Sequence, residues 1–327
     1  MRTNSRLIAV CGVFAASIYL SMTAWSQNAL DEQSPVADFA VQMPLAANSL
    51  ILDITRSQTG FVAVGERGHV LISEDGKTWT QASTVPTRAT LTSVFSLGDR
   101  LWAGGHDAVI ISSDDAGNTW TLQNYDSQRE QAVMDIFFTD ADNGMAIGSY
   151  GLYMRTDDGG QSWIDDSVDE ENEFHLNAMV SMGEERLMIA GEAGYSYRSE
   201  DGGDSWEALL LPYEGSMWGA INSSDGCVLF YGLRGHVQES CDFGESWEEL
   251  DTGTLASISG AAISDGFLVL AANSGTLLTR NANGQFLVHN HVSGVDFSAA
   301  LPLTSGGFLL VGEDGVHHYS VEGAQDD

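Results

Sequence analysis

Five aspartates recur along the chain, each four or five positions before a tryptophan. They are Asp75, Asp115, Asp158, Asp201 and Asp242, and the tryptophans are Trp79, Trp120, Trp163, Trp206 and Trp247. Taken one at a time, such carboxylates suggest general acid–base catalysis, and the tryptophans suggest a cage for a ligand. Their repetition in one shared setting favours a structural role for both residue types.

The shared setting is the Asp box, Ser/Thr-x-Asp-x-Gly-x-Ser/Thr-Trp. Full copies occupy 113–120, 156–163, 199–206 and 240–247, a copy shortened by one residue occupies 73–79, and a worn copy with Asn for Asp and Phe for Trp occupies 279–286. The aspartate can accept backbone N–H bonds in a tight loop, and the glycine permits a left-handed backbone. The tryptophan is expected to begin an outer strand and pack on the neighbouring sheet.

The spacing of the boxes predicts the fold. Their final aromatic residues fall at 79, 120, 163, 206, 247 and 286, a period of about 40 residues that is typical of a four-stranded propeller blade. An apolar hairpin with a glycine-containing turn precedes each box, and a seventh copy follows the last box. These hairpins are Val62–Ser73, Leu101–Ser113, Met145–Thr156, Leu187–Ser199, Leu229–Ser240, Leu268–Thr279 and Phe308–Ser320.

The sequence therefore predicts an all-β protein, a seven-bladed β-propeller of four-stranded Asp-box blades. The last hairpin has no outer strand after it, whereas the segment Ala37–Met43 looks like a strand that follows a box elsewhere. We expect this N-terminal strand to complete blade seven and close the ring. The predicted boundaries are 1–26 for a signal peptide, 27–35 for a linker, 36–322 for the propeller and 323–327 for an acidic tail.

The charge balance excludes one class of function. The 327 residues include 46 acidic and 13 basic side chains, for a formal net charge of −33, and Lys77 is the only lysine. Binding to nucleic acid or to anionic lipid requires clustered Lys and Arg. Nucleic acid is therefore not an expected partner, and the acidity could instead reflect a saline habitat.

The N-terminus reads as a secretion signal. Arg2 and Arg6 precede the apolar stretch Leu7–Leu20, and Ala24 and Ser26 place small residues at the −3 and −1 positions of a cleavage site. An uncleaved anchor is the alternative, although the apolar run is short for a membrane span. Cleavage after Ser26 predicts a periplasmic or secreted protein without a membrane span.

A family resemblance agrees with the repeat. The stretch 143–163, NGMAIGSYGLYMRTDDGGQSW, resembles the repeat of the photosystem II stability and assembly factor family, in which a strand with Gly-x-x-Gly runs into a Thr-x-Asp-Gly-Gly-x-Thr-Trp turn. The resemblance implies a propeller and a non-catalytic assembly role, with a client protein or an envelope or membrane complex as partner. That family's binding surface is rich in arginine, whereas the few arginines here are scattered. We expect a monomer.

Ligands of propellers usually meet the face formed by the turns between the second and third strands and by the loops between blades. Candidate binding residues on this face are Arg67, His106, Tyr150, Glu192, Arg234 and Trp218. Asp boxes also occur in sialidases, which need a Tyr nucleophile with a Glu partner and three arginines on a carboxylate. Tyr150, Glu192, Arg67 and Arg234 could fill such roles, so a secreted sialidase-like glycoside hydrolase is the alternative function.

No cofactor or metal is expected, since no Gly-rich loop leads into a helix and the close histidine pairs have no cysteine at zinc-site spacing. The two cysteines of the propeller lie in one blade. Pairing about the turn at Leu233 and Arg234 puts Cys227 opposite Ser240, with Cys241 as its near neighbour. An oxidising compartment favours a disulfide between Cys227 and Cys241, while the diagonal offset opposes it.

Overall fold

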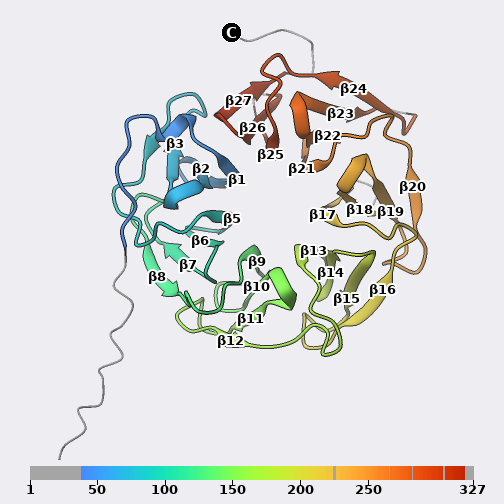
Figure 1. Ribbon diagram of the computed structural model, residues 1–327, viewed down its shortest axis with the longest axis horizontal. Coiled ribbons are helices and arrows are strands. Elements are labelled where there is room, and N and C mark those ends of the chain that lie inside the picture. The colour runs from blue at the N-terminus through green and yellow to red at the C-terminus, as the bar shows by residue number, and fades with distance from the viewer. Residues whose placement is uncertain (1–37, 224–225, 265, 282, 305, 321–327) are drawn as a thin grey trace, which may run out of the picture. The chain divides into compact units, whose positions relative to one another are not determined.

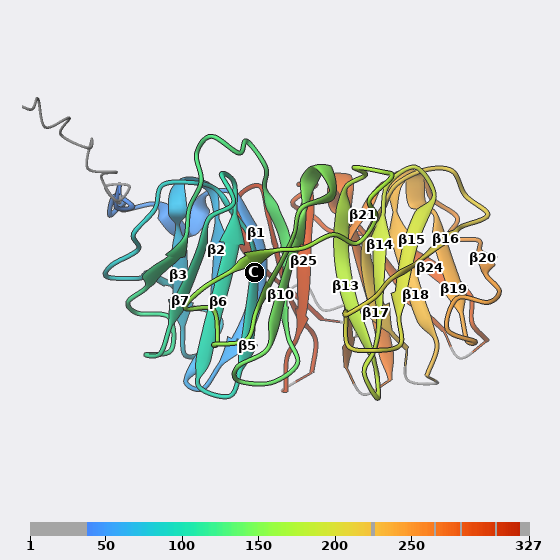
Figure 2. The ribbon, with the colours of Figure 1, turned by 90° about the horizontal axis from the view of Figure 1, so that it is seen from below.

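The computed structural model describes residues 38–223, 226–264, 266–281, 283–304 and 306–320. The predicted signal peptide, the linker and the acidic tail lie outside these ranges. In the unit Ala37–Asp327, seven antiparallel sheets stand around a central axis (Figure 1). Figure 2 shows the same ring from the side, with the strands running between its two faces. The predicted seven-bladed β-propeller is confirmed.

Six blades have four strands each, numbered outward from the axis in chain order. Blade one has β1 (Ile51–Ser57), β2 (Gly60–Gly65), β3 (Val70–Ser73) and β4 (Thr80–Gln81). Blade two has β5 (Leu91–Leu97), β6 (Arg100–Gly105), β7 (Ile110–Ser113) and β8 (Thr121–Asn124). Blade three has β9 (Val133–Phe138), β10 (Gly144–Gly148), β11 (Tyr153–Thr156) and β12 (Ile164–Asp165).

The second half of the ring repeats this order. Blade four has β13 (Leu176–Gly183), β14 (Arg186–Gly191), β15 (Tyr195–Ser199) and β16 (Glu207–Leu210). Blade five has β17 (Met217–Asn222), β18 (Val228–Gly232), β19 (Val237–Ser240) and β20 (Glu248–Leu250). Blade six has β21 (Ile258–Ser264), β22 (Phe267–Ala272), β23 (Thr276–Arg280) and β24 (Phe286–Asn290). Blade seven has β25 (Phe297–Pro302), β26 (Phe308–Gly312) and β27 (Gly315–Tyr319).

In the described part of the chain, five short 3-10 helices accompany the strands. One, η1 (Ala46–Asn48), precedes β1, and the other four form turns between the second and third strands of their blades. These four are η2 (Glu66–Gly68), η3 (Ser149–Gly151), η4 (Leu233–Gly235) and η5 (Asn273–Gly275). The seven hairpins predicted from the sequence are the second and third strands of the seven blades.

The core lies between neighbouring blades. At the junction of blades two and three, for example, Trp102 and Ile110 cluster with Phe138, Ala146 and Met154. Trp102 is fully buried and stacks on Phe138 with ring centroids 3.8 Å apart. Each blade therefore depends on its neighbours for burial of its apolar faces.

The expected closure of the ring by an N-terminal strand is wrong for the described residues. Blade seven has three strands, and residues 38–43 form no strand but lie against blade one. There the backbone N–H of Ala40 donates to the carbonyl of Val85 over 3.0 Å, and the side chain of Gln42 donates to the carbonyl of Ala82 over 2.7 Å. The short connection to β1 keeps this segment beside its own blade.

Side chains close the ring instead. Blades seven and one share an apolar cluster that includes Phe61, Leu71, Leu309 and Val311. Across the same junction, Nε2 of His318 lies 2.9 Å from the carbonyl oxygen of Gly76. The guanidinium of Arg56 also donates to the carbonyl of Pro302. Packing and side-chain hydrogen bonds thus link the first and last blades.

The Asp boxes are closed by their own hydrogen bonds. In the box of blade three, Oδ1 of Asp158 accepts the backbone N–H of Ser162 over 2.9 Å, and Oδ2 accepts the Ser162 hydroxyl over 2.6 Å. The hydroxyl of Thr156 donates to Oδ1 as well. The indole of Trp163 packs in the cluster between blades two and three. These contacts agree with the structural role expected for the box residues.

The box carboxylates should make stability sensitive to acid. Hydrogen bonds from Ser162 lower the pKa of Asp158 to about 2, below its ordinary 3.8. A lowered pKa in the folded state adds stability above pH 3.8, and this contribution is lost as the pH falls toward 2. We expect Asp158→Asn to reduce the change in urea midpoint between about pH 2.5 and pH 5. The exposed neighbour Asp157 provides the control, and equal pH profiles for Asp158→Asn and Asp157→Asn would contradict the prediction.

A disulfide joins Cys227 and Cys241, with their Cα atoms 4.1 Å apart. The strand register differs by one residue from the one expected, because Val228 and not Cys227 pairs with Ser240. Cys227 therefore lies directly opposite Cys241, and the diagonal offset that opposed the bond does not exist.

Candidate functional site

The first strand of each of the seven blades carries a bulge near its start. In blade one the register skips between Ile51 and Asp53, so that Leu52 has no partner on β2. The corresponding residue of each of the seven blades lines a central cavity of about 410 Å³: Leu52, Thr92, Met134, Asn177, Trp218, Ser259 and Ser298. We call these seven residues the bulge ring. In blade three the register skips from Val133 to Asp135 in the same way, so that Met134 has no partner on β10. At each bulge the extra residue leaves the regular strand pairing. Its side chain lines the central cavity, which we call the channel.

The turns between second and third strands lie at the same end of the blades as the bulge ring, since Ile51 pairs with Gly65, just before η2. We call this end the turn face. Arg67, Tyr150 and Arg234 occupy the middle of η2, η3 and η4, with φ of 57°, 54° and 56°. Such left-handed conformations are uncommon for residues other than glycine. All three side chains are exposed.

Three of the predicted site residues lie at the channel mouth, two in a cavity wall and one packed against it. A cavity of about 320 Å³, which we call the mouth cavity, is lined by Thr92, Met134, His175, Asn177, Glu192, Ser216 and Trp218. Nδ1 of His175 lies 3.1 Å from a carboxylate oxygen of Glu192. The ring of Tyr150 packs edge-on against His175, with centroids 4.9 Å apart. Tyr150, Glu192 and Trp218 thus belong to one cluster around His175.

His175 was missed from the sequence, where it stands two residues after the end of an acidic run. Its position directly before β13 is the signal that could have identified it, because loops between blades reach the turn face. Two further pairs continue the row of rings. The ring centroids of Phe174 and Tyr195 are 4.6 Å apart, and Tyr213 stacks on His236 with ring centroids 3.7 Å apart. We call these four residues, with Tyr150 and His175, the aromatic band.

The other three candidates do not join this cluster. Arg67, His106 and Arg234 are exposed on blades one, two and five, and none of them lines the mouth cavity. Arg67 has Glu66 as its ion-pair partner at 3.8 Å. Within the described parts of the chain, no hydrogen bond joins Tyr150 to Glu192, and no arginine lines the cavity. The arrangement that a sialidase requires is therefore not formed by these residues.

Two carboxyl groups also line the channel, and each belongs to the residue that follows a member of the bulge ring. Asp53 accepts the backbone N–H of Ile54 over 2.8 Å and, across the blade boundary, that of Val94 over 2.7 Å. Asp135 accepts the backbone N–H of Met179 in the next blade over 2.8 Å. Burial raises the pKa of Asp53 to about 7 and that of Asp135 to about 6, although the backbone hydrogen bonds oppose the change. The channel therefore favours protonated carboxyls up to near neutral pH.

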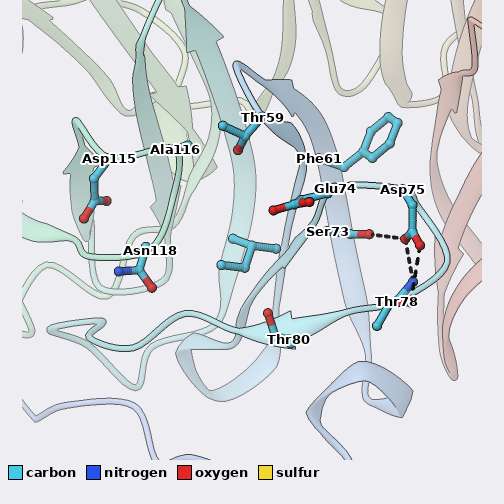
Figure 3. A pocket seen from close by; sticks show the side chains of 11 residues that line it. Thr59, Phe61, Ser73, Glu74, Asp75, Thr78, Thr80, Asp115, Ala116 and Asn118 are labelled. Carbon is cyan, nitrogen blue, oxygen red and sulfur yellow. Dashed lines mark hydrogen bonds between the residues drawn. The ribbon is translucent and has the colours of Figure 1, made fainter.

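A third cavity, of about 490 Å³, lies between the boxes of blades one and two (Figure 3). Its lining includes Phe61, Glu74 and the box residues Asp75 and Asp115. The carboxylate of Asp75 is held within its own loop by the backbone N–H groups of Lys77 and Thr78, each at 2.8 Å. The box carboxylates here are occupied by turn formation.

Two further properties concern the described residues as a whole. No group of three or more His, Cys, Asp or Glu side chains among them is arranged to hold a metal ion. Within the same ranges, no helix has the length and apolar character needed to cross a membrane.

Residues 122–293, just over half of the chain, match the family described as photosynthesis system II assembly factor YCF48. The chain belongs to this YCF48 family. The resemblance drawn from the repeat is thereby confirmed. Residues 23–177 also match the family described as DUF6242 beta propeller domain. No curated protein sequence matches the chain.

Solved structures of YCF48 proteins share the fold. One described as YCF48 bound to D1 peptide has a TM-score of 0.67 at 19% identity, covering 86% of this chain and 94% of that one. YCF48 from Cyanidioschyzon merolae has a TM-score of 0.67 at 17% identity, covering 88% and 99%. A streptogramin B lyase has a TM-score of 0.71 at 13% identity, covering 84% and 94%. The lyase shows that the same fold also carries enzymes.

Proposed function

We propose that this YCF48-family propeller is a non-catalytic protein-binding module that holds a segment of a client protein at the turn face. The observation that carries the proposal is the cluster at the channel mouth, where Trp218 and Tyr150 remain 38% and 58% exposed beside the mouth cavity. Large aromatic side chains supply much of the energy of protein recognition. The peptide in the solved YCF48 complex supports a protein segment as the ligand.

The form of the site favours an extended segment over a folded domain. The aromatic band runs from η3 of blade three to η4 of blade five, and its members come from loops between blades as well as from turns. Rings spread over three neighbouring blades, with His175 in the cavity wall, provide successive contacts for alternate side chains of one strand-like peptide. The carboxylate of Glu192 adds a polar contact at the cavity wall.

We further propose that the protein works as an exported monomer, in the periplasm or outside the cell, on an envelope or membrane complex under assembly. The signal-like segment 1–26 and the disulfide between Cys227 and Cys241 support this compartment. The low content of Lys and Arg supports a protein client over nucleic acid.

The client can be captured through Tyr150. A photo-crosslinking amino acid at position 150 is expected to link the client in an envelope extract, whereas the same group at Ile164, 66% exposed on the outer strand β12, should not. Peptides that tile the captured protein then identify the bound segment by fluorescence anisotropy. Equal capture at both positions would speak against a turn-face site.

Trp218→Ala is expected to weaken binding of that segment by about 2 kcal/mol, or roughly thirtyfold in Kd, as for an aromatic anchor at an interface. The matched control is Leu210→Ala, which removes an equally apolar, 71% exposed side chain from the outer strand β16. Leu210→Ala should leave the Kd unchanged. A captured segment that binds Trp218→Ala as tightly as the unmodified protein would refute the site.

A further inference from the structure

Tyr231 brings a phenol into the channel from the second strand of blade five. It is only 6% exposed, yet it lines the central cavity. Its ring passes over Gly219 of β17, where a Cβ atom would lie 2.3 Å from the phenol oxygen. Glycine at that position therefore admits the phenol to the channel. Among the described residues, no hydrogen bond to this hydroxyl is found, and its oxygen is not among their fully buried atoms without a partner, so it can take a partner from within the cavity.

The two channel carboxyls are joined through one strand. Asp53 accepts the N–H of Val94, and the adjacent Ser93 donates its hydroxyl to Asp135 over 3.2 Å. Both carboxyls increase the pKa of Tyr231, after the larger effect of its burial. Asp53, Asp135 and Tyr231 thus act on one another within the same cavity.

The central cavity combines carboxyl acceptors with a lining that contains no basic side chain. Its remaining lining side chains are apolar, hydroxyl or amide groups, and none is basic. Both oxygens of Asp53 and Oδ2 of Asp135 each accept one hydrogen bond from the described residues, so each retains a lone pair for another donor. A hard metal ion would need several more oxygen ligands than these, and the described residues form no such group.

The mouth cavity gives access to these groups. It shares Thr92, Met134, Asn177 and Trp218 with the central cavity. Asp53 and Asp135 follow the bulge ring by one residue, and one residue of a strand advances about 3.3 Å. The indole of Trp218 offers a face to the stem or the charge of a cationic side chain.

We propose that the channel binds an alkylammonium group between Asp53, Asp135 and Tyr231, supplied by a lysine side chain of the client segment or by a free polyamine. An ammonium has three N–H donors on a narrow stem, which suits acceptors at the bottom of a restricted opening. Arginine is less suited, because its planar fork requires a wider paired acceptor surface. The inference rests on the proposed function, since the client segment would enter through the mouth cavity.

The protein itself offers a reporter of binding at this site. With its nine tyrosines labelled as 3-fluorotyrosine, the resonance of Tyr231 can be assigned as the one that Tyr231→Phe removes. Titration uses N-acetyl-lysine methylamide, its neutral norleucine counterpart and spermidine. Sodium chloride at about 0.5 M shortens the Debye length to about 4 Å and suppresses non-specific attraction to the acidic surface.

The lysine probe or spermidine should shift the Tyr231 resonance to saturation, and the norleucine probe should not. Asp53→Asn and Asp135→Asn should each weaken binding at least tenfold, or about 1.4 kcal/mol. Asp157→Asn, which removes one exposed charge from the box of blade three, should leave the affinity unchanged. Circular dichroism checks that each variant is folded, and the probe comparison on the unmodified protein stands without any variant.

The pH dependence gives a second readout. The titratable groups that face the two cavities are Asp53, Asp135 and Tyr231 in the channel, and His175 and Glu192 at the mouth. Affinity for the lysine probe should rise between pH 5 and 8 as the channel carboxyls ionise. The rise should persist in His175→Gln and be reduced in the double variant Asp53→Asn, Asp135→Asn. A rise that disappears with His175→Gln would overturn the assignment to the channel.

The client segment distinguishes the two sources of the ammonium. A segment whose binding is weakened by acetylation of one lysine identifies that lysine, whereas a Tyr231 shift with spermidine alone identifies a free polyamine. If the segment binds through Trp218 but neither acetylation nor Asp53→Asn changes its Kd, and no probe shifts Tyr231, the ammonium site is overturned while the proposed function stands. If no segment binds at the turn face, the proposed function fails, and the probes alone decide the ammonium site.

Discussion

Trp102→Ala is expected to lower the free energy of unfolding by about 3–5 kcal/mol, the largest effect of any single substitution considered for this fold. The indole is fully buried and stacks on Phe138 of the next blade. Its Nε1–H donates to the carbonyl of Gly159 over 3.0 Å, in the box of blade three. Alanine would therefore leave a large cavity between two blades and a box carbonyl without its donor.

Two variants separate the contributions. Trp102→Phe keeps a ring against Phe138 but removes the indole N–H, so its destabilisation should be clearly smaller than that of alanine. Leu287→Ala removes an apolar side chain that is 49% exposed on β24 and should change stability by less than about 0.5 kcal/mol. Urea unfolding followed by near-ultraviolet circular dichroism gives the comparison. A loss below about 1 kcal/mol for Trp102→Ala would mean that the blade junction rearranges to fill the space.

The repeat could be predicted from the sequence because its information is local. Each box fixes a turn through contacts within one short loop, such as those between Asp158 and Ser162. Each hairpin is an apolar run with a short turn, and the period between boxes sets the size of a blade. Blade number, strand order and the structural place of the box tryptophans follow from these short-range signals.

The closure of the ring could not be predicted in the same way. The segment near Phe39 has the composition of an outer strand, but composition does not say which blade it meets. The side chain of Gln81 donates to the carbonyl of Val41 over 3.0 Å, which holds the segment beside blade one. The link to blade seven depends on His318 and Gly76, which are 242 positions apart in the chain. No local pattern marks such a pair.

Only part of the candidate site could be predicted from the sequence, and the reason is related. Turns are visible in a sequence, so Tyr150 could be placed on the turn face before its contacts were known. The bulges that place Trp218 beside His175 are not visible, because they depend on pairing between strands. Asp53 and Asp135 sit in strands whose alternation is weak, and only the ring brings them to a common channel with Tyr231. Long-range register therefore decides the chemistry of this site.

Removal of the disulfide is expected to lower the free energy of unfolding by about 3 kcal/mol, because the bond closes a loop of 14 residues in the unfolded chain. The variant with both Cys227→Ala and Cys241→Ala should be slightly less stable than the unmodified protein measured in dithiothreitol. Cys227 is buried at 6% exposure, so alanine adds a small cavity term that reduction alone does not.

The same comparison bears on the compartment in which the protein works. Dithiothreitol should not change the free energy of unfolding of the double variant. A further decrease would show that the reductant acts on something other than this disulfide. A reducing compartment would leave the unmodified chain about 3 kcal/mol less stable, a large part of the 5–15 kcal/mol typical of a folded domain. Because an oxidising compartment maintains the bond, the proposed export would give blade five this stability. Equal urea midpoints with and without reductant would contradict both the stabilisation and this link to export.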